Sequence, residues 1–256
     1  MNFTVLKKST IIKTLLLVVS LSILFPLLNY SSAHTVFNGN SSRLLPIYSV
    51  KTEEKKVAIS FDCAWGVDYT DELLSIMQEE NVKCTFFCVE FWSTKHTDYL
   101  KKISEMGHEI GTHSATHPYM SKLSSDQIKR ELTSSMAFIE RTTGKKVELF
   151  RPPYGDYSNT LIETAKSLGL YTIQWSVDSL DWKDLSASEI TKRVVSRVEN
   201  GSIVLFHNQG LNTSKALRGI IKELKEKGYE FVKIGELIYR ENFKIEPDGS
   251  QVKINN

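Results

Sequence analysis

Two histidines close together in the chain are the first residues that could do chemistry. His113 and His117 flank the tripeptide Ser-Ala-Thr, and on a helical turn this spacing would place both imidazoles on one face. Imidazoles paired in this way commonly bind a divalent metal ion. A pair of polar loop histidines that bind nothing is the alternative. The strand-like segment before them favours the metal interpretation.

A third histidine, His207, is a candidate proton donor. It follows the apolar run Ile203–Phe206, so its ring should emerge at the end of a strand, where it could protonate a substrate near neutral pH. A structural role in capping the strand is equally open. Asp181 could orient His207 and keep it protonated, and Trp182 could pack in the core or stack on a sugar ring.

A short rigid turn carries an arginine. Residues 151–155 read Arg-Pro-Pro-Tyr-Gly, and the two prolines restrict the backbone. A structural turn explains the prolines and the glycine. It does not explain Arg151, which needs an acidic partner such as Asp62 if it is buried.

These residues follow strand-like segments, and amphipathic helical segments lie between them. Such alternation predicts an α/β fold with parallel strands and outer helices, either an open doubly wound sheet or a barrel. No G-x-G-x-x-G run follows the first strand, which disfavours a dinucleotide-binding sheet. A barrel gathers its chemistry at the C-terminal ends of its strands. Seven strands are expected, at residues 57–61, 84–89, 108–111, 148–150, 171–175, 202–206 and 230–232.

The helices expected between these strands have recognisable ends. Ser124 with Gln127, and Ser186 with Glu189, fit capping boxes. A short last helix should follow Ile234. The other helices are expected at residues 70–80, 98–106, 125–143, 160–168, 187–199 and 214–227.

The chain is expected to hold one domain behind an export signal. Residues 1–33 combine a lysine-bearing start, an apolar run and small residues, which is typical of a signal peptide, with a retained signal-anchor as the alternative. Residues 34–54 form a lead-in segment, residues 55–240 the domain, and residues 241–256 a C-terminal tail. We therefore expect an exported protein that contacts a membrane only if the signal is retained.

The charge of the chain gives no reason to expect a nucleic-acid partner. The sequence has 32 Lys and Arg against 30 Asp and Glu. Loss of the signal would remove three lysines and leave 29 basic residues against 30 acidic ones. The mature chain would therefore be nearly neutral.

Three cysteines, Cys63, Cys84 and Cys88, are too few for a disulfide framework. On one strand Cys84 and Cys88 would lie ~13 Å apart at roughly 3.3 Å per residue, which is too far for a disulfide bond. Both are expected to be small buried core residues. Cys63 and Cys88 would come close if their strands are neighbours.

Together these motifs resemble the polysaccharide deacetylases, the NodB-like group also called carbohydrate esterase family 4. The similarity extends over residues 56–238. Residues 61–66 and 175–178 are most similar to the PdaB-like sporulation branch, which implies a spore or cell-wall peptidoglycan context. Five segments in the family's order carry the resemblance: residues 60–63, 113–117, 151–154, 178–182 and 205–207.

The resemblance implies a fold and a reaction. The fold is a distorted (β/α) barrel with about seven parallel strands in a single domain, and the reaction is metal-dependent hydrolysis of an N-acetyl amide. It implies that Asp62 is the general base, that His113 and His117 bind the metal, and that His207 is the general acid. Hydrolysis of an amide needs these parts because water must be activated and the departing amine protonated.

The resemblance also implies supporting roles. Asp181 would tune the acid, and Arg151 would hold the base. Tyr154 would offer its backbone N–H to the oxyanion, and Trp182 with Leu205 would line the pocket for the acetyl group.

Cys63 departs from the family's pattern, because it stands where the family has a second aspartate as third metal ligand. As a thiolate it would give a Cys-His-His site that favours zinc, so we expect a divalent metal ion and zinc in particular. Asp68 or Asp71 could reach the metal instead, or the two histidines could hold it alone. A further alternative is that Cys63 only packs, and that the barrel binds glycan without hydrolysing it.

We expect a working enzyme because candidates for base, acid and oxyanion donor are all present. Its substrate should be an N-acetylated extracellular glycan, first of all cell-wall or spore peptidoglycan, with a chitooligosaccharide as the alternative. A catalytically weak or inactive glycan-binding or spore-envelope protein is the rival from another class. The expected location is secreted, in the cell wall or spore envelope, or membrane-anchored and facing outward.

Overall fold

The computed structural model describes residues 43–254, which belong to one compact unit of the chain. The predicted signal, residues 1–33, lies outside the described residues. Within 43–254, no helix has both the length and the apolar composition needed to cross a membrane.

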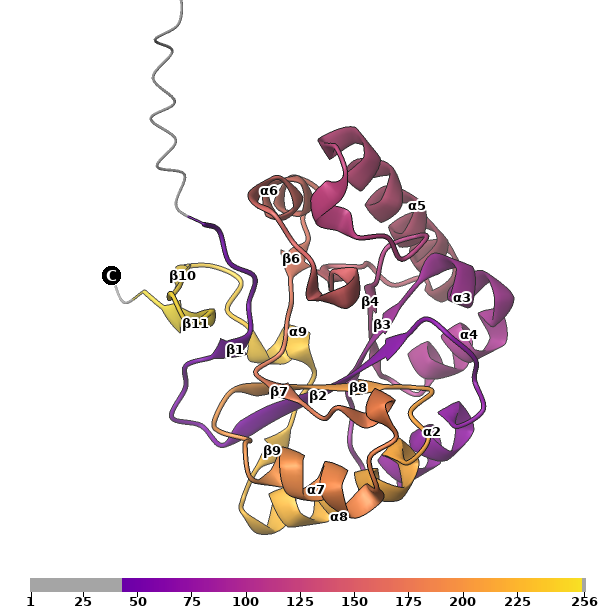
Figure 1. Ribbon diagram of the computed structural model, residues 1–256, viewed down its shortest axis with the longest axis vertical. Coiled ribbons are helices and arrows are strands. Elements are labelled where there is room, and N and C mark those ends of the chain that lie inside the picture. Colours follow the sequence, from indigo (N-terminus) through magenta and orange to yellow (C-terminus); the bar gives the residue numbers. More distant parts are fainter. Residues whose placement is uncertain (1–42, 255–256) are drawn as a thin grey trace, which may run out of the picture. The chain divides into compact units, whose positions relative to one another are not determined.

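A curled, mostly parallel sheet forms the centre of this unit (Figure 1). From β2 to β6 the strands lie side by side in chain order, and β8 lies on the other side of β2, also parallel to it. The predicted distorted barrel is confirmed, and β7 is a strand that the prediction lacked. The strands are β2 (Lys56–Cys63), β3 (Thr85–Cys88), β4 (Glu109–Thr112), β5 (Leu149–Phe150), β6 (Tyr171–Thr172), β7 (Val177–Asp178), β8 (Ser202–His207) and β9 (Glu230–Phe231).

Helices cover the outside of the sheet (Figure 1). Both predicted capping boxes are confirmed, since the hydroxyls of Ser124 and Ser186 accept hydrogen bonds from the backbone N–H groups of Gln127 and Glu189. Helix α3, which directly follows β3, was not predicted because its 6 residues form fewer than two turns. The helices are α2 (Thr70–Glu79), α3 (Glu90–Lys95), α4 (Thr97–Glu105), α5 (Ser125–Thr143), α6 (Asn159–Ser167), α7 (Ala187–Val195), α8 (Thr213–Glu226) and α9 (Ile234–Leu237).

Strand β2 is buried on both faces because it lies in the middle of the sheet. Its odd-numbered residues, 57 to 63, pack in the larger hydrophobic cluster with residues of the helices. Ala58 belongs to a second cluster on the inner side, and Ser60 and Asp62 share its face by the alternation of side chains along a strand. Asp62 and Cys63 therefore point to opposite sides of the sheet.

The lead-in segment joins the two ends of the parallel sheet, although the sequence showed no clear pattern there. The N–H of Ile47 donates to the carbonyl of Thr172 at 2.9 Å, and its carbonyl accepts from the N–H of Gln174 at 2.7 Å. Two residues further on, β1 (Ser49–Val50) pairs antiparallel with β8. Residues 47–50 therefore connect the β6 side of the sheet to β8.

The prediction of a tail at residues 241–256 requires a correction. Strands β10 (Phe243–Ile245) and β11 (Ser250–Lys253) form an antiparallel hairpin, and β11 pairs in parallel with β1. The buried amide of Gln251 accepts from the N–H of Tyr239 and donates to its carbonyl, both at 2.8 Å. Strand β11 was not predicted because its buried residues are a serine and a glutamine, which give no hydrophobic pattern. Their hydrogen-bond partners come together only in the folded chain.

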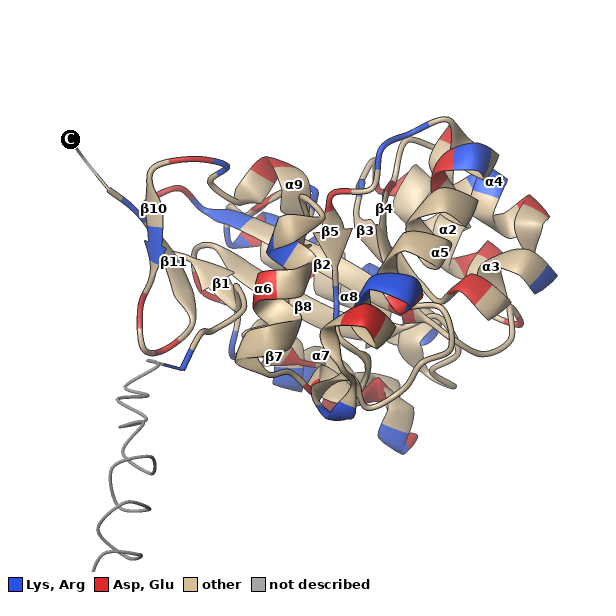
Figure 2. Cartoon of the chain, turned by 90° about the horizontal axis from the view of Figure 1, so that it is seen from above, with Lys and Arg blue, Asp and Glu red and all other residues tan. Residues whose placement is uncertain are grey.

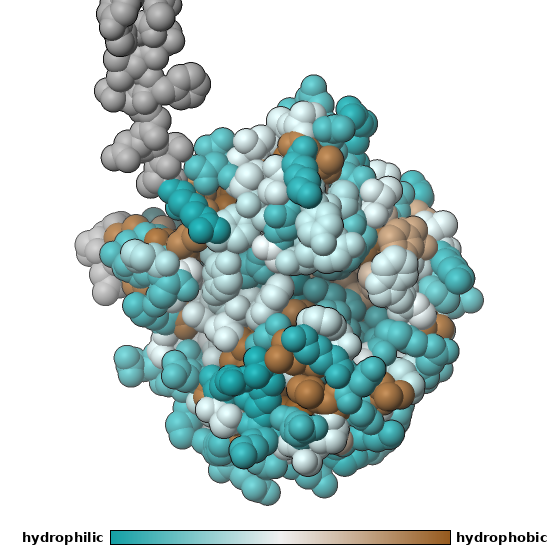
Figure 3. All heavy atoms as spheres, in the orientation of Figure 1, coloured by the Kyte–Doolittle hydropathy of each residue, from teal (hydrophilic) through white to brown (hydrophobic). Residues whose placement is uncertain are grey.

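The surface is polar and of mixed charge. Figure 2 shows Lys and Arg interspersed with Asp and Glu on the outer elements. On the face drawn in Figure 3, hydrophobic residues form small separate patches between hydrophilic ones. Figure 2 shows no broad region of one charge.

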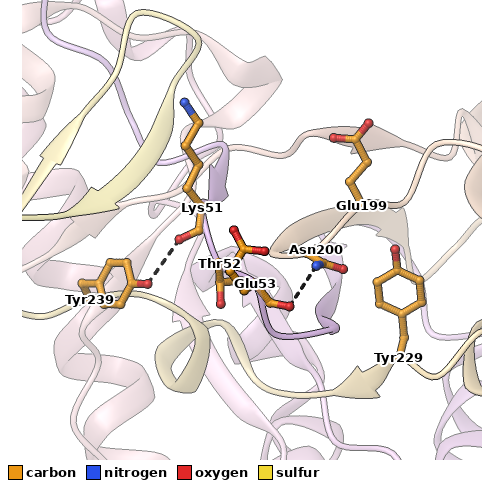
Figure 4. Close-up of a pocket in the computed structure, with 7 residues that line it drawn as sticks. All are labelled: Lys51, Thr52, Glu53, Glu199, Asn200, Tyr229 and Tyr239. Carbon is orange, nitrogen blue, oxygen red and sulfur yellow. Dashed lines mark hydrogen bonds between the residues drawn. The ribbon is translucent and has the colours of Figure 1, made fainter.

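A surface pocket of about 770 Å³ lies near the N-terminal ends of β2 and β8 (Figure 4). The Tyr239 hydroxyl donates to the carbonyl of Lys51 at 3.2 Å, and the Asn200 amide donates to that of Glu53 at 3.1 Å. Because the predicted catalytic residues stand at the opposite ends of these strands, this pocket is separate from them.

Candidate active site

The carboxyl ends of the central strands bring Asp62 to an arginine and a histidine. Asp62 is buried near the end of β2, and its Oδ1 accepts a hydrogen bond from Nη1 of Arg151 at 2.8 Å. Its Oδ2 lies 3.5 Å from Nε2 of His113. Arg151 is fully buried, so Asp62 is the acidic partner that the sequence required for it.

Burial and neighbouring charges act on Asp62 in opposite directions. Burial alone would favour the protonated acid, but the charge of Arg151 and its hydrogen bond to the carboxylate oppose it, and the pKa of Asp62 is held below its usual range. The carboxylate is therefore ionised at neutral pH and can accept a proton.

His113 and His117 lie on a loop after β4, not on the helical turn that the sequence predicted. Ser114 and His117 have positive φ angles of 71° and 58°. The Ser114 hydroxyl accepts the N–H of His117 at 3.0 Å, and the carboxylate of Glu131 accepts two further N–H groups of the loop. The two imidazole centroids are 4.9 Å apart, so the histidines meet as predicted, on a different backbone.

Both imidazoles are held in the neutral form. Burial, the largest effect, lowers the pKa of His113 and lowers that of His117 to about 4. Nδ1 of His113 lies 2.7 Å from the carbonyl of Arg151, which can only accept, so the proton is assigned to Nδ1 and the lone pair of Nε2 faces Asp62. Nδ1 of His117 is buried without a hydrogen-bond partner among the described residues. Neutral imidazoles with free lone pairs suit a cation.

Cys63 does not join the two histidines. It is completely buried in the helix-side cluster, and it lies directly opposite Cys88 in the register of β2 and β3. Burial raises the pKa of the Cys63 thiol well above its usual value, and the hydrogen bond with Cys88 adds to this effect. The sequence-based expectation of a thiolate ligand is therefore not supported by this arrangement.

The two aspartates considered as substitutes are also occupied elsewhere. Asp71 accepts hydrogen bonds from Tyr99 and Lys102, and Asp68 accepts one from the amide of Gln209. Among residues 43–254, no group of three or more His, Cys, Asp or Glu side chains is placed to bind a metal ion. The two histidines fit a metal site, but the three-ligand set implied by the resemblance does not.

His207 ends β8, and Asp181 holds its ring and its backbone. Nδ1 of His207 lies 2.8 Å from Oδ1 of Asp181, and the backbone N–H donates to Oδ2 at 2.8 Å. The Thr213 hydroxyl, which sequence analysis did not single out, donates to the same Oδ2 at 2.7 Å. Burial disfavours the imidazolium, but the hydrogen bond and charge of Asp181 outweigh it and raise the pKa of His207 above its usual value.

Asp62 and His207 are direct neighbours in the parallel register of β2 and β8. The carboxylate is ionised and the histidine is easily protonated. The fold therefore places a proton acceptor beside a proton donor at the same end of the barrel.

Tyr154 lies in the turn that follows β5, on the short 3-10 helix η2 (Pro153–Gly155). It has a φ of 60°, and the next residue, Gly155, has a φ of 68°. The side-chain amide of Gln174 donates to the carbonyl of Gly155 at 3.0 Å. This hydrogen bond fixes the turn that carries the backbone N–H of Tyr154.

Gln174 is a positioning residue that the sequence analysis missed. Its N–H donates to Ile47 of the lead-in segment, and its carbonyl accepts from Nη2 of Arg151 at 3.1 Å. With the bond to Gly155, one buried residue connects the closing segment, the arginine and the turn. A glutamine between Ile173 and Trp175 was the available signal, since a buried amide must find partners.

Leu205 and Trp182 both lie close in the chain to the predicted acid or its partner. Leu205 is two residues before His207 on β8, so the two side chains share a face, and it is buried. Trp182 follows Asp181 on the 3-10 helix η3 (Asp181–Lys183) and is 56% exposed. Their contact with an acetyl group stays a prediction.

A barrel with an ionised carboxylate beside a protonable histidine has the parts of an acid–base hydrolase. Comparison with known proteins gives the family, because the family model described as polysaccharide deacetylase matches residues 49–173. The chain belongs to the polysaccharide deacetylase family, which is a family of hydrolases. The predicted family is confirmed, and the sporulation branch stays a prediction.

Three similar proteins show the range of this family. The uncharacterized protein YlxY of Bacillus subtilis (strain 168) is 35% identical over 209 residues, which cover 82% of this chain and 65% of YlxY. A peptidoglycan-N-acetylglucosamine deacetylase of Bacillus cereus is 34% identical over 196 residues, which cover 75% of this chain and 92% of that protein. The crystal structure of a CE4 family pseudoenzyme from Bacillus anthracis matches with a TM-score of 0.73 and 36% identity, covering 75% of this chain and 68% of the other. The chain thus spans less than two thirds of YlxY, and the family includes both named enzymes and a pseudoenzyme.

Proposed function

We propose that this protein removes N-acetyl groups from an extracellular glycan, with peptidoglycan as the first candidate. The observation that carries the proposal is the pairing of Asp62 with His207 on adjacent strands. Relatives named as peptidoglycan-N-acetylglucosamine and peptidoglycan-N-acetylmuramic acid deacetylases support the substrate class.

In the proposed reaction, water beside Asp62 loses a proton to the carboxylate while its oxygen attacks the acetyl carbonyl carbon. The backbone N–H of Tyr154 would stabilise the resulting oxyanion. Protonated His207 then donates a proton to the amine nitrogen as the C–N bond breaks, which releases acetate and a free amino sugar. Arg151 keeps Asp62 in place and ionised.

A divalent metal ion, with zinc as the sequence-based expectation, would supply Lewis-acid polarisation of the substrate carbonyl. His113 and His117 are the residues that would hold it. Because Cys63 lies in the core, we expect weaker binding than at a site with three protein ligands.

Export and a role in the cell wall or spore envelope are also part of the proposal. The signal-like pattern of residues 1–33 supports secretion or outward-facing membrane anchoring. The peptidoglycan-directed relatives support the wall context.

The proposal is tested by acetate release from N-acetylated peptidoglycan and, in parallel, from chitooligosaccharides. The protein is first stripped of metal and then supplied with zinc, cobalt or manganese. Release from peptidoglycan supports the first candidate, and release from chitooligosaccharide alone would reassign the substrate. Release that does not respond to metal would contradict a metal-dependent reaction.

A second function, glycan binding without hydrolysis, is favoured by one observation, the burial of Cys63 on the wrong side of the sheet for a metal ligand. The similarity to a CE4 family pseudoenzyme supports it as well. Retention of peptidoglycan by the folded protein without acetate release under any of these metals would favour this second function.

A further inference from the structure

Two residues directly after His207 hold the loop that follows strand β2. They are Asn208 and Gln209, and the loop comprises residues 64–69, between β2 and α2. Asn208 is 1% exposed, so its side-chain amide needs partners inside the protein. Asn208 and Gln209 together are called the clasp below.

The clasp begins where the pairing of β2 with β8 ends. Asp62 and His207 are the last partners in the register of these two strands. The backbone N–H of Asn208 then donates to the carbonyl of Asp62 at 3.2 Å. Beyond this bond the two chains separate, because β2 leads on to α2 and β8 to α8. Side chains of the clasp connect them there.

The side chain of Asn208 makes two hydrogen bonds to the β2 side. Its Nδ2 donates to the carbonyl of Gly66 at 3.0 Å and to the hydroxyl of Thr70 at 3.3 Å. Nε1 of the buried Trp92, on α3, donates to the same carbonyl at 2.7 Å. The two lone pairs of the Gly66 carbonyl are both used. The middle of the loop is therefore fixed both from β8 and from α3.

Gln209 fits against the same glycine. Its amide donates to the carboxylate of Asp68, and its Oε1 accepts the N–H of Asp68 at 3.3 Å. Gly66 has a φ of 50°, and a Cβ at this position would lie 2.7 Å from the side chain of Gln209. The loop and the clasp therefore fit together closely only because residue 66 is a glycine.

We infer that Asn208 is a positioning residue, which holds Asp62 at its working distance from His207. The inference rests on the proposed function, in which Asp62 takes a proton from water and His207 gives one to the amine nitrogen. A small displacement between these two groups lowers the rate of the reaction much more than the affinity for the glycan. Because Asn208 is buried, it acts through the placement of Asp62 and His207.

The first test compares kcat and KM for acetate release from soluble N-acetylated peptidoglycan fragments by the full chain. Asn208→Leu removes the amide and keeps most of its volume. We expect kcat to fall by about 10-fold or more and KM to change by less than about 2-fold. The matched control is Gln251→Leu, which removes another buried amide with two hydrogen bonds, on β11. It should leave kcat unchanged.

A second measurement does not depend on hydrolysis. Burial lowers the pKa of His207, but the hydrogen bond and charge of Asp181 raise it, and the charge of Asp62 raises it further. Asp62→Asn should therefore lower the pKa of His207, which NMR of the imidazole ring measures. In the Asn208→Leu background this lowering should be roughly halved, because the carboxylate would lie farther away and nearer to water. In the Gln251→Leu background it should be as large as in the wild type.

Gln209→Ala keeps the inference testable if Asn208→Leu does not fold, because it removes only the half-buried part of the clasp. It should lower kcat by about 3-fold at unchanged KM.

The inference is overturned by an unchanged kcat in folded Asn208→Leu, or by an equal loss in Gln251→Leu. If the wild type releases no acetate, the proposed function fails, and the pKa of His207 decides on the clasp. An equally large effect of Asp62→Asn in the wild type and in Asn208→Leu would then show that Asn208 does not hold the two residues together.

Discussion

The two sides of β2 at its carboxyl end differ sharply, although they are formed by consecutive residues. On the inner side, Asp62 belongs to a polar network with Arg151 and His113. On the outer side, Cys63 packs in the helix-side core opposite Cys88. The inner side carries ionisable groups that could take part in acid–base chemistry, whereas the outer side is buried and apolar like the rest of the core.

This difference shows which part of the site the strand itself can specify. A strand presents alternate residues to opposite faces, so β2 can deliver only one of two adjacent side chains to the interior. Asp62 is the one delivered. Asp62 and its neighbour His207 are therefore positioned by the strands themselves. A residue at position 63 points to the opposite face, so it could bind a metal on the inner side only if the strand departed from its regular alternation.

The largest expected effect comes from breaking the inner network at Arg151. Arg151→Met leaves Asp62 buried without its charged partner, which should lower the free energy of unfolding by about 3–5 kcal/mol and abolish acetate release. Chemical denaturation measures the first and the acetate assay the second. Lys146→Ala, which removes an exposed ion pair with Glu148, should cost below about 1 kcal/mol.

The double variant Asp62→Leu/Arg151→Met sharpens this prediction. With both partners replaced by apolar residues, no unpaired charge remains, and part of the lost stability should return. A double variant less stable than Arg151→Met alone would show that the pair is not the reason for the loss.

The next effect concerns the pH dependence of the reaction. In the proposed reaction His207 donates a proton, so activity should fall as pH rises through its pKa, which Asp181 raises. Asp181→Asn should move this alkaline limb to lower pH and reduce the rate by about 10- to 100-fold. The acid limb belongs to Asp62, whose pKa is lowered, and should stay where it is. A pH–rate profile with an unmoved alkaline limb would show that Asp181 does not tune the acid.

On the outer side, replacing Cys63 should affect stability and not metal content. Cys63→Ser buries a hydroxyl in an apolar cluster, at a cost of about 1–3 kcal/mol. Zinc bound per molecule should be the same as in the wild type. A loss of zinc in a folded Cys63→Ser protein would mean that Cys63 binds metal after all, and that the two sides of β2 cooperate.

The smallest expected effect concerns the reactivity of the three cysteine thiols. Cys63, Cys84 and Cys88 are free and fully buried, and burial raises the pKa of the Cys63 and Cys84 thiols. A thiol reagent should therefore label none in the folded protein and three after denaturation. Only one labelled thiol after denaturation would indicate a disulfide bond, which the register allows between Cys63 and Cys88.

The sequence predicted the central strands and the residues at their ends because hydrophobic periodicity and motif residues coincide there. Ser124 and Ser186 marked helix starts by local chemistry alone. Those features depend on a few neighbouring residues, so they can be predicted from the local sequence.

The features that the sequence missed depend on distant partners. The role of Gln174 depends on the lead-in segment and on Arg151, because both form hydrogen bonds with its backbone in the folded chain. The loop of His113 and His117 looked helical by spacing, but the positive φ of Ser114 cannot be read from its residue type. Which face Cys63 takes follows from the register of β2, and that register is set by the whole sheet.

The most direct test of the central claim is acetate release from N-acetylated peptidoglycan by the wild type, Asp62→Asn and His207→Ala. Glu226→Gln, an exposed carboxylate at the far end of α8, is the matched control. We expect release by the wild type and the control, and a loss of about 10²-fold or more in both site variants, which should still fold and bind the glycan. Unchanged release in either site variant would contradict the acid–base assignment. No release by a folded wild type that binds the glycan would contradict hydrolysis itself.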